Sequence, residues 1–191
     1  EGVEICDKIF NVKAVHVLDP TLLLDENDYS PILNEFKKVI FKDNKYIGVY
    51  LLTDTTLKAG HALNASEQTK LKVINLYGDK TNIMGREFLR FRKVEEWLNG
   101  IKNASFVITD SYHCIIFCII MGVNFVCLPN ERGGASRIKN LLNVIGLEDR
   151  FCTDKIIDFN DYYSKEIDFY QIYERLKPFK NKSLAYLSNA L

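Results

Sequence analysis

The chain has 191 residues, with 25 Lys+Arg against 25 Asp+Glu, so its formal net charge is zero and gives no reason to expect broad binding of nucleic acid. Hydrophobic residues make up 47% of the chain, which excludes a disordered protein and is enough for one packed core. The longest apolar run, Cys114 to Val123, is too short to span a bilayer, so the sequence predicts no transmembrane helix.

The first 44 residues predict an interdomain connector and a leading helix. Residues 12–18 favour a short strand, which Asp19-Pro20 ends because proline cannot continue a strand ladder. Ser30-Pro31 is typical of a helix start, with Ser as the cap and Pro at the first position. Apolar residues then follow at helical spacing, namely Ile32, Leu33, Phe36, Val39 and Ile40. The chain opens on Glu1 rather than Met, and we expect it to be part of a longer protein.

Strands and helices alternate from residue 46 onward. Buried strands are expected at 46–52, 73–77, 106–109 and 124–128, with a last short strand at 151–153. Helices are expected at 62–71, 94–101, 110–121 and 136–145, and again from residue 168 with an interruption near Pro178, while 81–92 is interpreted as a loop. This order predicts right-handed βαβ units and a mainly parallel sheet. We therefore expect one Rossmann-like α/β domain at 45–177, preceded by the connector at 1–44 and followed by a trailing helix at 178–191.

The five cysteines are interpreted as free thiols in a reducing compartment. Their number is odd, four of them lie in apolar runs, no C-x-x-C pair occurs, and no His stands at zinc-ligand spacing from a Cys pair. Cys114 and Cys118 are four residues apart on an apolar helix, so we expect both to be buried and reduced. The sequence predicts neither a metal site nor a bound cofactor.

The segment from Thr109 to His113 carries the sharpest chemical signal. In a parallel sheet the ligand crevice lies outside the carboxyl ends of the strands, and here a strand ends where a buried helix begins. The first helical turn offers free N–H groups and a partial positive charge that suit an anion, and His113 falls in that turn. A bound anion would favour the imidazolium, so His113 is a candidate acid or base. In the alternative interpretation, Ser111 only caps the helix and His113 bonds a neighbouring carbonyl group.

A second candidate is the segment 130–137, which contains Asn130, Arg132 and Arg137. Its paired glycines allow close approach of the backbone to a ligand, and Arg137 at the next helix start could bind a carboxylate or phosphate through two bonds. The alternative is a solvated loop, since neither G-x-G-x-x-G nor a P-loop is present.

A third candidate is a cluster of four cations that could attract an anionic donor or glycan. The alternative interpretation is a solvated loop and helix start. The cluster comprises Arg86, Arg90, Arg92 and Lys93. His16 and His61 belong to no motif, and we expect both to be structural or exposed.

Several of these stretches together resemble the polysaccharide pyruvyl transferase family. The resemblance covers most of the chain and is most specific in Glu96-Trp97-Leu98, in Thr109-Asp110-Ser111-Tyr112-His113 and in Ser136-Arg137; it also includes residues 18–23, read Leu-Asp-Pro-Thr-Leu-Leu. It implies the C-terminal, donor-binding half of a two-domain GT-B-like enzyme, which transfers pyruvate from phosphoenolpyruvate to a pair of sugar hydroxyls as a ketal during bacterial surface polysaccharide synthesis.

The resemblance also implies roles for single residues. His113 takes the position of the family's functional histidine, with Ser111, Asn130, Arg132 and Arg137 as substrate-binding candidates. A branch of the family has Arg-Leu-His where this chain has Ser-Tyr-His, so Arg137, Arg132 or the cations at 86–93 would supply the anion contacts, or the donor would differ. The expected partners are phosphoenolpyruvate, a glycan or lipid-linked sugar acceptor and an N-terminal domain, in the cytoplasm or peripheral to the inner membrane.

Two other functions stay open. One is a GT-B transferase that uses a nucleotide sugar, for which Glu131 is the only acidic candidate to hold a ribose; the other is a non-catalytic Rossmann-like module. If the first interpretation holds, residues 1–191 should fold but should not turn over alone, because the cleft would need the other half.

Overall fold

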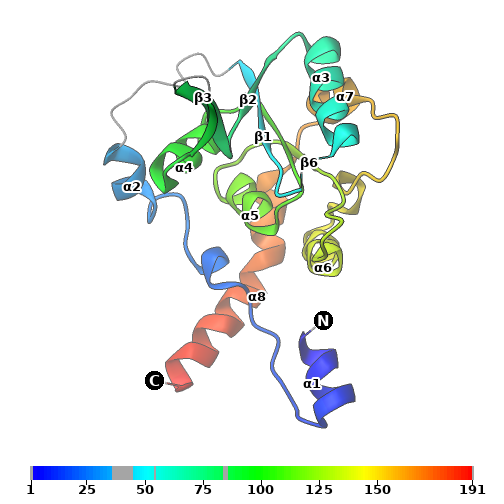
Figure 1. The fold of residues 1–191 in the computed structure, drawn as a ribbon. Helices are drawn as coiled ribbons and strands as arrows, with labels where there is room; N and C mark the ends of the chain where they lie inside the picture. Colours follow the sequence, from blue (N-terminus) through cyan, green and yellow to red (C-terminus); the bar gives the residue numbers. More distant parts are fainter. Residues whose placement is uncertain (1, 36–44, 54, 84–85, 191) are drawn as a thin grey trace.

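The computed structural model describes residues 2–35, 45–53, 55–83 and 86–190, and it is built around a parallel β-sheet (Figure 1). The strands are β1 (Tyr46–Tyr50), β2 (Lys72–Asn75), β5 (Phe106–Thr109) and β6 (Phe125–Cys127), in the spatial order β2-β1-β5-β6. Every neighbouring pair is parallel, and Phe151 continues the sheet through a single parallel bridge to Cys127. This confirms the predicted α/β class with a Rossmann-like sheet.

Helices cover both faces of this sheet. One side holds α3 (Thr56–Thr69) and α7 (Phe159–Ser164); the other holds α4 (Val94–Lys102), α5 (Tyr112–Ile120), α6 (Ala135–Ile145) and α8 (Phe169–Ala190). Successive strand residues point to opposite faces, so Phe106 and Ile108 of β5 join the core under α3 while Val107 joins the core under α5. Because both faces are covered, the central strands are apolar throughout, as the sequence indicated.

The N-terminal segment consists of α1 (Gly2–Phe10), a 3₁₀ helix η1 (Pro20–Leu23) and α2 (Ser30–Glu35). Helix η1 packs against α5 and α2 packs against α4, whereas α1 buries no residue and lies away from the sheet (Figure 1). The strand predicted at 12–18 is wrong. The segment is extended but joins no sheet: Leu18 is buried and its N–H donates to the Ser183 hydroxyl of α8 at 2.9 Å, while Val12 and Val15 stay exposed. The helix start at Ser30 is confirmed, and its expected continuation through Phe36, Val39 and Ile40 lies outside the described residues.

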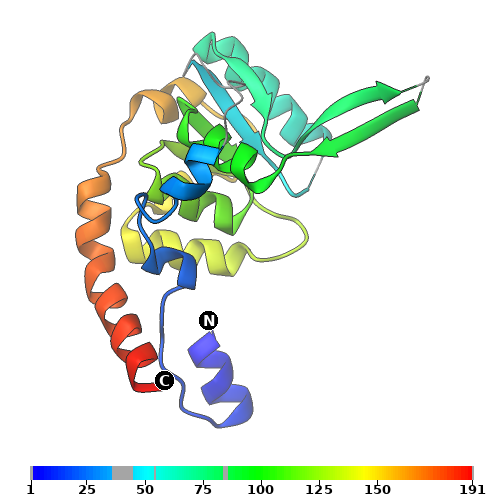
Figure 2. The same cartoon turned by 90° about the vertical axis from the view of Figure 1, so that its left-hand side faces the viewer.

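Two predictions for residues 73–92 are wrong. The strand β2 is an edge strand with mostly exposed side chains, rather than a strand buried on both faces. The expected loop is a hairpin of β3 (Gly78–Ile83) and β4 (Arg86–Phe91), which extends away from the domain (Figure 2). Gly78 starts this hairpin, and a Cβ atom at this position would lie 2.6 Å from the carbonyl oxygen of Arg90.

The helices differ from expectation mainly in length. The weak helix predicted at 62–71 begins earlier, because Thr55 caps it by accepting a bond from the N–H of Lys58. The short helix α7 was not predicted, and α8 continues through Pro178 without interruption. Among the described residues, no helix is both long enough and apolar enough to cross a membrane.

The buried cysteines give a testable prediction. Cys114 and Cys118 are fully buried and unpaired, as expected, and burial raises the pKa of the Cys118 thiol, with Cys114 adding to the shift. Since the thiolate is the reactive form, we expect a thiol reagent to label only the partly exposed Cys6 in the native chain. Denaturant should release all five thiols. Rapid native labelling of Cys114 or Cys118, followed by peptide mass spectrometry, would contradict this.

Candidate functional site

The sheet order places a topological switch point between β1 and β5. From β1 the chain crosses outward to β2, whereas β5 and β6 lie on the other side of β1, so the winding direction reverses between β1 and β5. Ligands of doubly wound sheets bind at the carboxyl ends of the strands beside such a switch point. Here those ends are Leu51 to Thr53 after β1 and Asp110 to Ser111 after β5.

A buried carboxylate joins the two strand ends. One oxygen of Asp110 accepts the backbone N–H of Leu52 at 2.6 Å; the other accepts the backbone N–H of Thr53 at 3.1 Å and its hydroxyl at 2.6 Å. The ammonium of Lys58 lies 2.7 Å from that second oxygen and also donates to the Thr53 hydroxyl. The Lys58 side chain is only 5% exposed, so this ion pair is largely shielded from water and holds the carboxyl ends of β1 and β5 together.

The next residue starts α5. The Ser111 hydroxyl accepts the N–H of Cys114 at 3.4 Å, and the N–H of Ser111 itself donates to the Thr109 hydroxyl at 3.1 Å. This is the N-cap that the sequence indicated, and it places Tyr112 and His113 in the first turn, where backbone N–H groups lack intrahelical acceptors. In this structure the Ser111 hydroxyl therefore serves as the cap of α5.

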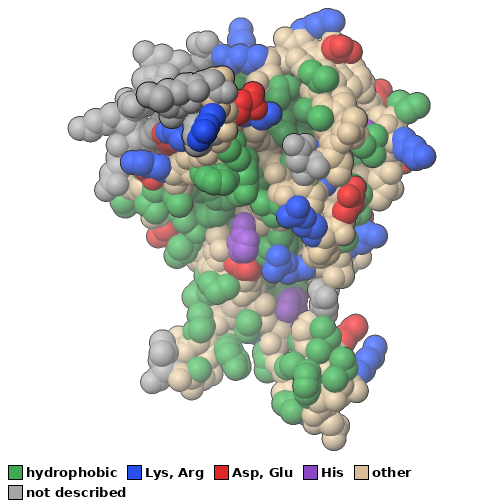
Figure 3. All heavy atoms as spheres, viewed as in Figure 1, with side chains coloured by type: hydrophobic (Ala, Val, Ile, Leu, Met, Phe, Trp, Pro, Cys, Tyr) green, Lys and Arg blue, Asp and Glu red, His purple; other side chains and the backbone are tan. Residues whose placement is uncertain are grey.

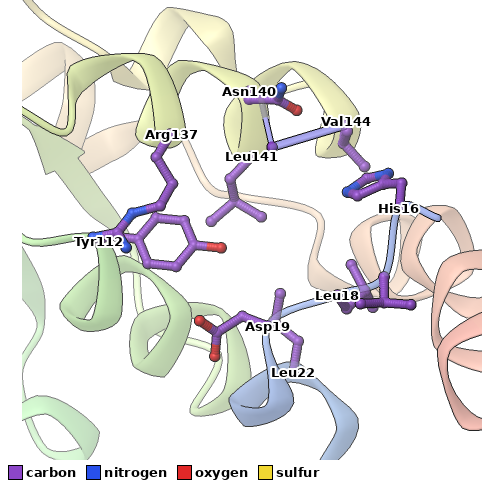
Figure 4. A pocket seen from close by; sticks show the side chains of 11 residues that line it. His16, Leu18, Asp19, Leu22, Tyr112, Arg137, Asn140, Leu141 and Val144 are labelled. Atoms are coloured by element: carbon purple, nitrogen blue, oxygen red, sulfur yellow. The ribbon is translucent and has the colours of Figure 1, made fainter. Parts of the chain in front are cut away.

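A pocket of about 190 Å³ lies beside this helix start, between the N-terminal segment, α5 and α6 (Figure 4). Leu18, Leu22, Leu141 and Val144 supply its apolar wall. Its polar lining residues are His16, Asp19, Tyr112, Arg137 and Asn140. Three distant parts of the chain therefore converge on one pocket.

Arg137 and Tyr112 form one side of this pocket. The guanidinium carbon of Arg137 lies 4.4 Å from the centre of the Tyr112 ring, a cation–π arrangement in which the charge stays exposed (Figure 4). Burial raises the pKa of Tyr112, the Asp19 carboxylate adds to that rise, and Arg137 opposes it. The Tyr112 hydroxyl thus stays neutral between an anion and a cation. Gly134 is the N-cap of α6 and has φ +87°, a left-handed conformation that favours glycine.

His113 lies next to the pocket without lining it. Its imidazole is 52% exposed, its ring centre is 5.5 Å from that of Tyr112, and its Nε2 lies 3.6 Å from Oδ2 of Asp19. The Asp19 carboxylate is itself fixed, because Oδ1 accepts the N–H of Thr21 at 3.0 Å as the cap of η1. Figure 3 shows histidine, acidic and basic side chains gathered at the lower centre of this face.

The other substrate-binding candidates take different positions. Asn130 donates to the backbone carbonyl of Asp110 at 3.4 Å and accepts the N–H of Arg132 at 2.9 Å, so it ties the loop before α6 to the start of α5. The side chain of Arg132 is exposed on that loop, as is Glu131, and neither lines the pocket. Of the predicted binding residues, the structure brings Arg137 to the pocket directly.

Two members of the predicted cation cluster, Arg90 and Arg92, are paired with carboxylates away from the pocket. Arg90 pairs with Asp79 at 3.2 Å and with Glu96 at 3.3 Å, and Arg92 pairs with Asp79 at 2.7 Å. These contacts join the two strands to each other and to the start of α4. None of the four cations lines the pocket.

Sequence reasoning missed several residues of this region. His16 lines the pocket, although no motif indicated it; His61, in contrast, is buried against Phe159 as a structural histidine, and burial lowers its pKa. Lys58 carried no signal, because a lysine in a helix normally points to solvent. Asp19 was noted for ending a strand and as part of the family resemblance at residues 18–23, but no role in the site was predicted for it. Within the described parts of the chain, no group of three or more His, Cys, Asp or Glu side chains could hold a metal ion.

One of three comparisons with known proteins identifies a family. Searches of the curated proteins and of the solved structures return no match to the chain. The family model described as polysaccharide pyruvyl transferase matches residues 4–132, which is more than half of the chain and includes Asp19, the Asp110 junction and His113. Arg137 lies beyond the matched part. The chain therefore belongs to the polysaccharide pyruvyl transferase family.

Proposed function

We propose that this chain is the donor-binding half of a GT-B-like transferase that moves pyruvate from phosphoenolpyruvate to two hydroxyls of one sugar, as a ketal. In the proposal, phosphoenolpyruvate binds the pocket between residues 16–22, α5 and α6. The observation that carries it is that Arg137 and Asp19 line one pocket beside the N-terminus of α5, and that His113 lies next to this pocket, 3.6 Å from the Asp19 carboxylate. The family membership supplies the reaction class.

The donor's chemistry fits these residues. Phosphoenolpyruvate has a phosphate and a carboxylate, which suit the N–H groups at the start of α5 and the forked guanidinium of Arg137. Ketal formation needs a proton on the methylene carbon, and the exposed imidazole of His113 is placed to supply it. As phosphate leaves, Arg137 and the helix N-terminus would stabilise its growing charge.

The pocket's size favours this donor over a nucleotide sugar. Its volume of about 190 Å³ is below the range of about 300–1,000 Å³ that is usual for drug-sized ligands. A three-carbon acid phosphate is compatible with that space. The separate pocket beside β1, β2 and α3 has no acidic side chain among its described lining residues that could hold a ribose. In the proposal, a glycan or lipid-linked acceptor enters from a second half of the enzyme, on the cytoplasmic side of the membrane.

The test measures pyruvyl transfer by the full-length protein. Phosphoenolpyruvate would be incubated with a panel of p-nitrophenyl hexosides, and released phosphate and the mass of the ketal product would be measured. We expect both products with phosphoenolpyruvate and neither with nucleotide sugars. Transfer from a nucleotide sugar instead would replace the proposal, and residues 1–191 alone should bind the donor without turning over.

Arg137→Ala should weaken donor binding more than it slows chemistry. The guanidinium contacts the donor's anionic groups in the ground state as well as in the transition state, so its loss raises the KM for phosphoenolpyruvate. We expect a rise of about tenfold, the loss of one charge-assisted contact, with a smaller change in kcat. Lys139→Ala is the matched control, because Lys139 lies on the same helix but over Phe151. An equal effect of both variants would contradict a specific contact by Arg137.

A further inference from the structure

Among the described residues, Asp19 is the acidic residue that lines the pocket, and the reaction proposed above requires a group that accepts a proton. It comes from η1, far from His113 in the sequence, yet its Oδ2 lies 3.6 Å from the imidazole Nε2. The contact of Oδ1 with the Thr21 N–H holds the carboxylate in orientation and leaves Oδ2 turned toward the α5 side of the pocket (Figure 4). The side chain is 21% exposed, so a ligand can reach it.

The reaction moves two hydroxyl protons for each sugar that is modified. One proton must be added to the methylene carbon, and each attacking hydroxyl must lose its own proton as its oxygen bonds to carbon. His113 as acid accounts only for the addition. A group that accepts the first hydroxyl proton must therefore lie close to the same carbon, within hydrogen-bond reach of the attacking oxygen.

We propose that Asp19 is the general base that takes the proton of the first attacking hydroxyl, and that it returns this proton to His113. The proposal rests on the proposed function. The guanidinium of Arg137 is committed to anion binding in that function, and the Tyr112 hydroxyl is kept neutral, so neither can accept the proton. Asp19 and His113 would then work as one acid–base pair across the mouth of the pocket.

Protons and electrons balance over one turnover. His113 gives its proton to the methylene carbon, the first sugar oxygen bonds to the adjacent carbon, and its proton passes to Asp19. The bond from that carbon to the phosphate oxygen then breaks, and phosphate leaves with the electron pair. The second sugar oxygen bonds to the carbon, and its proton leaves on the phosphate. The proton on Asp19 crosses the short gap to His113, which restores both groups.

Asp19→Asn is the test variant, because asparagine keeps the shape and the capping bond of the side chain but cannot take a proton. In the assay described above, we expect kcat to fall about 100-fold or more while the KM for phosphoenolpyruvate changes less than about threefold. Asp19→Ala should lose as much activity, and added formate should restore part of it by acting as a replacement base. Rescue by formate is a readout that a merely structural role would not give.

The matched control is Asp158→Asn, since Asp158 caps α7 by the same kind of bond, to the N–H of Asp161 at 3.0 Å, and lies away from the pocket. It should keep full activity. The assignment is overturned if Asp19→Asn keeps its kcat, or if its only effect is a higher KM. If the unmodified enzyme releases no phosphate from phosphoenolpyruvate, the proposed function itself fails, and the assignment of Asp19 fails with it.

Discussion

His113→Ala should lower the rate of pyruvyl transfer by about 100-fold or more, the scale of general acid catalysis, with almost no change in the thermal unfolding midpoint. The physical reason is the position of the side chain. Its imidazole is half exposed, its closest charged partner is Asp19 at 3.6 Å, and the helix cap is made by Ser111 rather than by His113. Removing it therefore deletes a proton donor without opening a cavity in the core.

The measurement pairs initial rates with a thermal melt of the same preparation. His61→Ala is an informative contrast, because His61 is buried against Phe159, and that variant should lower the melting temperature. Full activity of His113→Ala, or a large drop of its unfolding midpoint, would show that His113 is a structural histidine.

Asp110→Ala should have the largest effect on stability. It leaves the Lys58 ammonium buried without its counter-charge, and it removes the acceptor for two backbone N–H groups and the Thr53 hydroxyl. Breaking one side of a buried pair costs about 3–5 kcal/mol. In a protein of this size that corresponds to a melting temperature lower by about 6–20 °C.

The control for this prediction is an exposed ion pair. Lys102 lies 2.7 Å from Glu26 with both side chains about half exposed, and such pairs contribute about 0–1 kcal/mol. Lys102→Ala should therefore leave the unfolding midpoint nearly unchanged. A small effect of Asp110→Ala in urea or thermal unfolding would contradict this prediction. It would mean that water screens the Asp110–Lys58 ion pair and that the pair does not hold the ends of β1 and β5 together.

Much of the fold could be predicted because its elements carry local signals. The strand at 106–109, the Ser111 cap and the helix closed by Gly146 follow from apolar runs and helix-end residues that act within a few positions. The hairpin was missed because β3 is mostly polar and β4 shows no regular alternation of apolar and polar residues, so the segment resembles a solvated loop when its cross-strand ion pairs are unknown. The edge position of β2 depends on the order of strands in space, which no local pattern records.

The site was predictable only in part, because some of its residues carry local signals and others reach it through the arrangement of the chain in space. His113 and Arg137 could be found because each stands at a helix start, where an anion is favoured. Asp19, His16 and Lys58 reach the site through tertiary packing of distant segments, so their sequence neighbours say nothing of it. The family model covers Asp19 and His113 without indicating that their side chains meet.

The most direct measurement of the central claim is a titration of the chain with phosphoenolpyruvate, followed by NMR of its histidine and tyrosine ring signals. The account predicts saturable shifts of the Tyr112, His113 and His16 rings, much weaker binding by Arg137→Ala, and no shift of the buried His61 ring. A nucleotide sugar should leave the same signals unchanged. Saturable shifts with the nucleotide sugar alone, or shifts with phosphoenolpyruvate that spare Tyr112 and His113, would contradict a donor site between residues 16–22, α5 and α6.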